Sequence, residues 1–234
     1  MLLATLREEV LEANLELVRR GLVLSTFGNA SGIARTDGLI VIKPSGVPYE
    51  AMKARDLVVT DLHGQVVEGT LRPSSDLPTH AALYRAFPSI GGIAHTHSEY
   101  ATAWAQACMP IPCFGTTHAD YFHGPIPVTE VMDEEQVVGE YEANTGVVII
   151  RAFENLDAMS IPAVLVANHG PFAWGPNPVK AAETAWMLES VARMAYLTAN
   201  INPRACDIGK TLHDRHFLRK HGEQAYYGQP RPKE

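Results

Sequence analysis

Cysteine is scarce in this sequence. The three cysteines, Cys108, Cys113 and Cys206, form no CxxC pair and leave one residue unmatched. A disulfide framework needs an even set, and a cysteine zinc site needs closely spaced pairs, so neither is indicated. This usage fits a reducing compartment, and we expect a cytoplasmic protein.

Long apolar runs and basic clusters are also lacking. No window reaches the roughly 20 apolar residues that cross a bilayer, and Arg7, Glu8 and Glu9 interrupt the apolar core that a secretory signal needs. The net charge is −7, whereas nucleic-acid binding depends on concentrated lysine and arginine. We therefore expect neither nucleic acid nor a membrane as partner. A small anion stays possible, because a few local donors can hold a phosphate.

What the sequence does contain is the composition of a folded globular protein. Hydrophobic residues make up 46% and charged residues 19% of the 234 residues, which suits one domain with a substantial core. We expect a single domain over residues 1–234, with a flexible tail only from about residue 229.

The spacing of apolar residues predicts strands that alternate with helices. Helical spacing occurs over residues 2–21, 77–87, 134–146 and 178–199, and strand-like runs cover 39–43, 56–61, 66–68, 91–97, 147–151 and 161–170. Small-residue stretches at 27–32, 43–46 and 73–76 indicate loops. Several strands are joined too tightly for helical crossovers. We therefore predict an α/β protein with a mixed, mainly antiparallel sheet and helices on its faces.

Two histidines lie two residues apart in the stretch GGIAHTHSEY. In a strand, side chains at i and i+2 leave the same face, so His95 and His97 would project together as a pair of metal ligands needs. With 10 histidines in the chain, this spacing arises by chance about 0.4 times, so two unrelated histidines remain an equal alternative. No HExxH occurs, so a metalloprotease helix is not supported.

Two further residues could complete a metal site. His169 ends an apolar run just before a glycine, where α/β proteins often place functional groups, although a turn histidine bonded to backbone is the alternative. Asp76 precedes a helical pattern, where it could equally be a helix cap. If the three imidazoles and the carboxylate converge, they suit Zn²⁺ or another divalent transition ion.

The small-residue loops FGNASG, KPSG and PSSD could bind a phosphate. Each offers glycine, serine or asparagine able to direct N–H and hydroxyl donors at an anion, and Lys43 would add a positive charge. Each loop taken alone is most simply a turn. Three of them beside a metal site would make a phosphate pocket.

Seven stretches of the chain match a known family. They are TFGNASG, VIKPSGVPYE, VVEGTLRPSSDLPTH, FPSIGGIAHTHSEYATAWAQA, GTTHADYFHGPIPVT, ANHGPFAWG and LRKHGEQAYYGQ, and the resemblance as a whole runs from about Leu2 to Gln229. Together they resemble the L-ribulose-5-phosphate 4-epimerase branch of the class II, metal-dependent aldolase and epimerase superfamily. The stretches GTTHADYF and LRKHG with AYYG are specific to that branch.

The resemblance implies a three-layer α/β/α sandwich and a homotetramer with active sites at subunit interfaces. It implies a sugar phosphate as substrate and one divalent metal ion per subunit, for which we expect Zn²⁺, with Mn²⁺ or Co²⁺ also compatible. The metal ligands would be Asp76, His95, His97 and His169. The phosphate-binding residues would be Gly28, Asn29, Lys43, Ser45, Gly46, Ser74 and Ser75. The acid/base residues would be Asp120 and Tyr227, with His216 nearby.

The implied reaction interconverts L-ribulose 5-phosphate and D-xylulose 5-phosphate. The hydrogen on C4 is not alpha to the C2 carbonyl, so its direct removal gives no stabilised carbanion. Cleavage of the bond between C3 and C4 instead leaves an enediolate, which a divalent ion stabilises, and glycolaldehyde phosphate. If the aldehyde turns over before the bond re-forms, C4 is inverted.

Other interpretations stay open. Spacing alone would make Asp120 a turn or cap residue and Tyr227 a packed aromatic. An aldolase of the same superfamily, acting for example on L-fuculose 1-phosphate, is one rival, and we expect such aldolases to carry glutamate where this chain has Asp76. A non-catalytic binding domain of the superfamily is a second rival, which the intact histidines argue against. No sequence element supports an unrelated zinc hydrolase.

Overall fold

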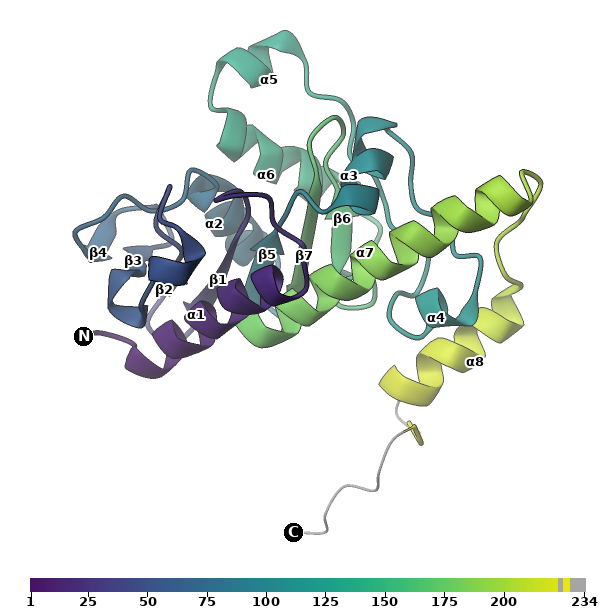
Figure 1. Ribbon diagram of the computed structural model, residues 1–234, viewed down its shortest axis with the longest axis horizontal. Coiled ribbons are helices and arrows are strands. Elements are labelled where there is room, and N and C mark those ends of the chain that lie inside the picture. Colours follow the sequence, from purple (N-terminus) through teal and green to yellow (C-terminus); the bar gives the residue numbers. More distant parts are fainter. Residues whose placement is uncertain (223–224, 228–234) are drawn as a thin grey trace.

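Seven strands form one sheet in the order β4-β3-β2-β1-β5-β7-β6. The computed structural model describes residues 1–222 and 225–227, and within them every pairing between neighbouring strands is antiparallel (Figure 1). The strands are β1 (Asn29–Ala34), β2 (Leu39–Ile42), β3 (Val58–Asp61), β4 (Val66–Glu68), β5 (Gly92–His95), β6 (Ala163–Leu165) and β7 (Pro171–Gly175). The predicted mainly antiparallel sheet is confirmed.

Helices cover both faces of the sheet. They are α1 (Ala4–Arg19), α2 (Leu77–Ala86), α3 (Glu99–Gln106), α4 (Thr116–Ala119), α5 (Glu134–Val138), α6 (Tyr141–Ala152), α7 (Pro178–Ile201) and α8 (Lys210–His221), with short 3₁₀ turns at Tyr49–Ala51 and Ala54–Asp56. Among these described helices, none combines the length and the apolar character needed to cross a membrane.

Two neighbouring residues of the central strand β1 show how the layers are built. The backbone of Gly32 faces α1 and α7, so closely that a Cβ there would lie 2.6 Å from Pro178. Ser31 points the other way, and its Oγ hydrogen-bonds to His80 and Tyr84 of α2. Because successive side chains of a strand leave opposite faces, α1 and α7 form one outer layer and α2 the other, with α6 packed on α2. The predicted three-layer α/β/α arrangement is confirmed.

Helix α1 follows the predicted amphipathic pattern. Val10, Ala13 and Leu17, spaced at i, i+3 and i+7, are fully buried against the sheet. Arg7 is also buried, because its guanidinium donates to the carbonyls of Ala54 and Leu57 and pairs with Glu68. Helix α1 is therefore held by the burial of its apolar face and by the ion pair of Arg7 with Glu68 of the edge strand β4.

Two sequence predictions are wrong. Residues 147–151 are not a strand but the second half of α6, where Val148 and Ile149 are buried together with Thr145 one turn earlier. That i, i+3, i+4 set is a helical face, and packing against α2 overrides the strand preference of the β-branched run. The stretch 27–32 is a loop only at residues 27–28, because β1 begins at Asn29 and its small residues let α1 and α7 approach.

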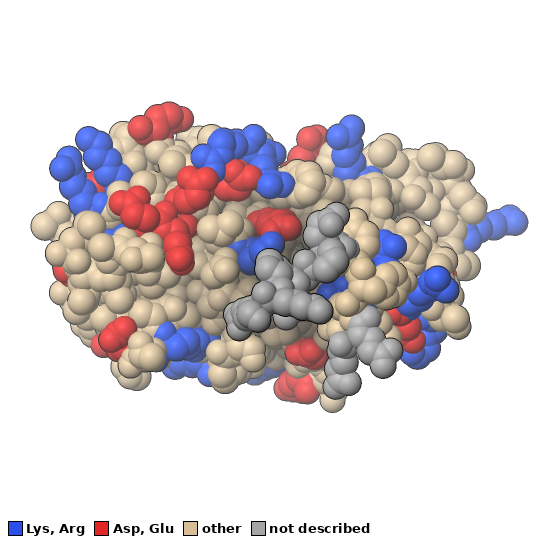
Figure 2. All heavy atoms as spheres, turned by 90° about the horizontal axis from the view of Figure 1, so that it is seen from below, with Lys and Arg blue, Asp and Glu red and all other residues tan. Residues whose placement is uncertain are grey.

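Other elements differ from prediction in extent or were missed. The predicted helix 134–146 is interrupted, with α5 ending at Val138 and α6 starting at Tyr141. The strand runs 91–97 and 161–170 shorten to β5 and β6, while β7, α3, α4 and α8 were not predicted. The tail predicted to be flexible from about residue 229 lies outside the described residues. Over the face seen in Figure 2, acidic and basic side chains are interspersed.

Candidate metal centre

Three histidines converge at the end of the sheet where β5 and β6 finish. His95 is the last residue of β5, His97 follows it, and His169 lies in the turn between β6 and β7. Each offers one ring nitrogen, and the three nitrogens all lie within 4.8 Å of one another. The structure thus brings together three of the four predicted ligands, although only His95 is in a strand.

The strand register places these residues. In the antiparallel pair of β5 and β7, His95 lies opposite Phe172, and the two rings stack at 4.1 Å between centroids. The turn that carries His169 must pass close to the chain after β5, because a Cβ on Gly170 would lie 3.0 Å from the Thr96 carbonyl oxygen. A glycine at 170 therefore allows His169 to approach the other two histidines.

One hydrogen bond fixes which nitrogen of His95 can bind a metal. Nδ1 of His95 lies 2.9 Å from the Pro171 carbonyl, to which it donates, so Nε2 carries the lone pair. The Nε2 atoms of His95 and His97 are 3.2 Å apart. Nitrogens bound at about 2.0–2.1 Å to one tetrahedral Zn²⁺ lie about 3.3 Å apart, so this separation fits two ligands of one ion.

Burial keeps the imidazoles of His97 and His169 neutral. It lowers the pKa of His169 to about 4, and the neighbouring His95 and His97 lower it further. The pKa of His97 is also lowered, mainly by burial and then by the neighbouring His95. Neutral imidazole is the form that binds metals, so no proton has to be removed from either ring near pH 7.

Asp76 lines the same pocket as the histidines. It stands at the N-cap position of α2, but its side chain makes no capping hydrogen bond. Its Oδ2 instead accepts a 2.6 Å hydrogen bond from Nδ2 of Asn29. Burial acts to raise the pKa of Asp76, but nearby His95 and His80 outweigh it, and the net pKa lies below its usual value. An ionised carboxylate beside three imidazoles is a donor set for a divalent transition ion.

The predicted phosphate-binding residues line the same pocket, whose volume is about 380 Å³. They are Gly28, Asn29, Lys43, Ser45, Gly46, Ser74 and Ser75. Lys43 is only 2% exposed, and its Nζ lies 4.7 Å from the centroid of the Tyr49 ring. Burial lowers its pKa, an effect that a bound phosphate would oppose. Asn29 differs from expectation, because its amide nitrogen is already used by Asp76 and its Oδ1 is buried without a partner.

Sequence reasoning missed several pocket residues. Tyr141 at the start of α6 places its hydroxyl 3.3 Å from Nδ1 of His169, and the Phe27 ring stacks on His97 at 6.1 Å. Glu142 lines the pocket beside Tyr141. Tyr141 and Glu142 carry no motif of their own, and only the position of α6 relative to the β6–β7 turn reveals them.

The predicted acid/base residues form a separate group. Asp120, at the end of α4, accepts hydrogen bonds from Arg219 at 3.0 and 2.7 Å and lies 3.1 Å from Nδ1 of His216. Tyr227 is 60% exposed, with the guanidinium of Arg219 4.8 Å from its ring centroid and Nζ of Lys220 at 4.6 Å. None of these described residues lines the pocket of the three histidines. Figure 1 shows α4 and α8 together at one end of the molecule.

Comparison with known families decides the assignment. The family described as Class II Aldolase and Adducin N-terminal domain matches residues 8–196, which is most of the chain. The chain belongs to this family.

Solved structures agree with this class II aldolase and adducin assignment. An L-fuculose 1-phosphate aldolase is 28% identical with a TM-score of 0.76, over 91% of this chain and 94% of that one. YgbL of Klebsiella pneumoniae, titled as a putative aldolase, epimerase or decarboxylase, is 26% identical with a TM-score of 0.69, over 90% and 97%. The L-fuculose-1-phosphate aldolase of Thermus thermophilus, 21% identical over 87% and 100% with a TM-score of 0.68, shows the shared fold.

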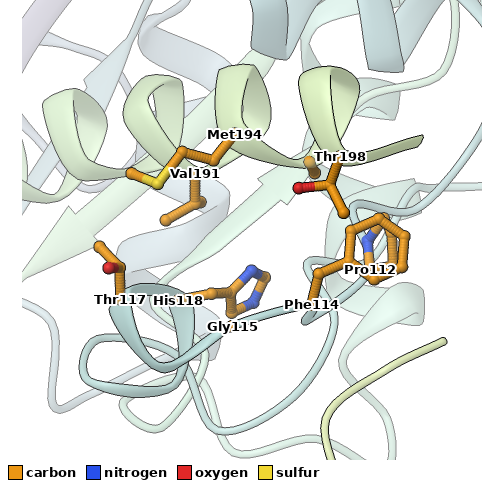
Figure 3. A pocket seen from close by; sticks show the side chains of 9 residues that line it. Pro112, Phe114, Gly115, Thr117, His118, Val191, Met194 and Thr198 are labelled. Atoms are coloured by element: carbon orange, nitrogen blue, oxygen red, sulfur yellow. The ribbon is translucent and has the colours of Figure 1, made fainter. Parts of the chain in front are cut away.

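A second pocket of this class II aldolase-family protein lies between α7 and residues 112–118 (Figure 3). Its volume is about 120 Å³, and apolar atoms of Val191, Met194 and Phe114 contribute to its lining. Burial lowers the pKa of His118 there to about 4, and its Nε2 donates to the Gly124 carbonyl at 2.8 Å. Unlike the pocket of the three histidines, which includes Asp76 and Glu142, this lining includes no carboxylate.

Proposed function

We propose that this protein is a metal-dependent epimerase that interconverts L-ribulose 5-phosphate and D-xylulose 5-phosphate. The observation that carries the proposal is the convergence of three histidine nitrogens in a pocket that Asp76 and three small-residue segments also line. A metal centre beside donors for a phosphate is what cleavage and re-formation of a carbon–carbon bond in a ketose phosphate needs.

In this proposal Asp76, His95, His97 and His169 hold one divalent ion, with Zn²⁺ as the expected metal. When bound, the ion would act as a Lewis acid toward the substrate oxygens next to the cleaved bond. The protein's own part is to keep these donors aimed. Pro171 fixes His95 through its carbonyl, and Asn29 fixes Asp76 through its amide.

The phosphate donors have two tasks. Cleavage between C3 and C4 releases glycolaldehyde phosphate, which must be retained and must turn its aldehyde over before the bond re-forms. Lys43 supplies a buried positive charge, and the hydroxyl groups of Ser45, Ser74 and Ser75, which line the pocket, supply hydrogen-bond donors. A tether at the phosphate permits this rotation while it keeps the carbonyl near the nucleophile.

Asp120, Tyr227 and His216 would serve as the proton donors and acceptors of the pocket of a neighbouring subunit in a homotetramer. Support comes from their separation from the histidine pocket and from their position on α4, α8 and the segment after it. Burial acts to raise the pKa of Asp120, but hydrogen bonds from Arg219 and His216 outweigh it and leave the net pKa below its usual value. Asp120 is thus ionised, which is the form that can accept a proton, while the contacts with Arg219 and His216 weaken it as a base.

Mixed oligomers test this arrangement. The His97→Asn variant lacks a metal ligand, and the Asp120→Asn variant lacks the acid/base carboxylate, so each should be inactive alone. Co-expressed at equal levels with two different tags, they should regain about a quarter of wild-type activity, since about a quarter of interface sites then combine two intact halves. Mixed oligomers as inactive as the parents would contradict an active site shared between subunits.

An aldolase of the same superfamily is the second candidate, favoured by the 28% identity to an L-fuculose 1-phosphate aldolase. Product analysis separates the two. The epimerase returns a five-carbon product and accumulates no free aldehyde, whereas an aldolase releases both fragments. Cleavage of L-fuculose 1-phosphate by the metal-loaded protein, with no change of L-ribulose 5-phosphate, would replace the epimerase proposal with the aldolase.

A further inference from the structure

A second group of metal-ligand residues lies between the loop after α4 and helix α8. His123 comes from the loop, and His213 and Asp214 come from the second turn of α8. Each offers one ligand atom, and these atoms all lie within 4.8 Å of one another. None of the three lines the pocket of His95 and His97, so this group is distinct from the site proposed above.

The hydrogen bonds of the group orient its donors as metal ligands are oriented. His213 donates through Nε2 to the Phe122 carbonyl at 3.1 Å, which leaves the lone pair on Nδ1. A ligating histidine usually donates its other N–H to a carbonyl or carboxylate in this way. His123 donates through Nε2 to Oδ1 of Asp214 at 2.9 Å, while Lys210 pairs with the other oxygen, Oδ2. The Lys210 contact therefore holds the carboxylate, and a shared ion would take the place of the proton between His123 and Oδ1.

The chemistry of the set selects the kind of ion. Two imidazoles and one carboxylate form a three-ligand set that Zn²⁺ accepts, with the fourth position left for water. The His123 side chain is 37% exposed and that of Asp214 27%, so an ion can reach the group from solvent. Ligands on a tetrahedral Zn²⁺ lie about 3.3 Å apart, so the side chains must close by about 1.5 Å at most. Such a closure is within the reach of exposed side chains.

We propose that His123, His213 and Asp214 bind a divalent transition ion, with Zn²⁺ as the probe, and that this ion clamps α8 to the loop after α4. The clamp has a structural consequence. Asp120 lies three residues before His123, and His216 lies one helical turn after His213. An ion at this position would therefore hold the two elements that carry the contact between Asp120 and His216.

Metal stoichiometry tests the proposal. The full chain, dialysed against buffered Zn²⁺ at neutral pH, is washed and its bound zinc is measured per chain by mass spectrometry. His213→Gln is the main variant, because glutamine can still donate to the Phe122 carbonyl but offers no imidazole. It should bind one equivalent fewer than wild type, and so should His123→Gln. The matched control is His63→Gln, an exposed histidine in the turn after β3, which should leave the stoichiometry unchanged.

The result does not depend on the first site. In a His95→Asn, His97→Asn background the remaining equivalent should still bind, and it should disappear when His213→Gln is added. A second measurement is the protection of α8 from hydrogen exchange, which should rise with Zn²⁺ in wild type but not in His213→Gln. The proposal is overturned if the His213 and His123 variants keep the wild-type stoichiometry, or if His63→Gln loses as much zinc, since the ion is then adventitious.

Discussion

The hydrogen bond between Asn29 and Asp76 should control metal affinity. Nδ2 of Asn29 donates to Oδ2 of Asp76 at 2.6 Å, and Asn29 is only 2% exposed. A hydrogen bond to a charged group contributes about 1.5–3 kcal/mol. If Asp76 is a ligand, the Asn29→Ala variant no longer holds the carboxylate in its orientation. The lost hydrogen-bond energy then reduces the free energy of metal binding. At about 1.4 kcal/mol per factor of ten, we expect metal affinity to fall by about 10- to 100-fold.

The pH dependence gives this prediction a second readout. The pKa of Asp76 lies below its usual value in the folded protein, and the Asn29 hydrogen bond is one of the causes. Such a carboxylate stabilises the fold above its unfolded pKa, and this contribution is lost as the pH falls through the folded pKa. Without Asn29 the folded pKa rises. The variant should therefore lose metal at a higher pH than wild type.

Competition with a chromogenic chelator, at about pH 7 and about pH 5, measures both effects. Asn14→Ala is the matched control. Asn14 of α1 is a fully buried amide that hydrogen-bonds to the backbone of Ala30, the neighbour of Asn29 in β1, and it does not contact Asp76. It should lower the free energy of unfolding and leave metal affinity unchanged. An Asn29→Ala affinity within about twofold of wild type, or an equal loss in Asn14→Ala, would refute the reasoning.

Three other predictions concern separate parts of the molecule. Tyr227→Phe should lose most turnover while it keeps its bound metal, and unchanged activity would remove Tyr227 from the mechanism. Gly146→Val should lower the free energy of unfolding by about 1–3 kcal/mol in urea titrations, because a Cβ at Gly146 meets that of Ala82 at 2.7 Å; an unchanged midpoint would contradict this packing. Burial lowers the pKa of His118 to about 4, so between about pH 4 and about pH 6.5 His118 is protonated only in the unfolded state. The free energy of unfolding should therefore fall on acidification by up to about 1.4 kcal/mol per pH unit in this range. In the His118→Gln variant it should fall less steeply. Equal slopes in the two proteins would contradict the His118 assignment.

Much of the fold could be predicted because its signals are local. The amphipathic spacing of α1 and the apolar pattern of α7 are properties of single segments, and both helices were expected. Residues 147–151 show the limit. Their β-branched run favours a strand, but Gly146 and Ile149, three residues apart, are buried on one helical face, and Gly146 packs against Ala82 of α2. That choice depends on a partner about 60 residues away in the chain, which no local pattern contains.

The candidate site divides in the same way. Residue type and spacing made His95, His97 and His169 candidates, the family resemblance made them the expected ligands, and their ring nitrogens do converge. The contacts that orient them could not be predicted, because Tyr141 meets His169 only through the packing of α6. The role of Asn29 toward Asp76 was likewise hidden, since both lie in segments that looked like phosphate loops and only the position of α2 beside β1 brings them together.

Conversion of L-ribulose 5-phosphate tests the central claim most directly. The metal-loaded protein is incubated with this substrate, and D-xylulose 5-phosphate is quantified before chelation, after chelation, and after Zn²⁺ is returned. We expect the product to form, to stop forming when the metal is removed, and to form again when zinc is restored. A metal-replete preparation that makes no D-xylulose 5-phosphate, or one that makes it equally well with a chelator present, would contradict the proposed function.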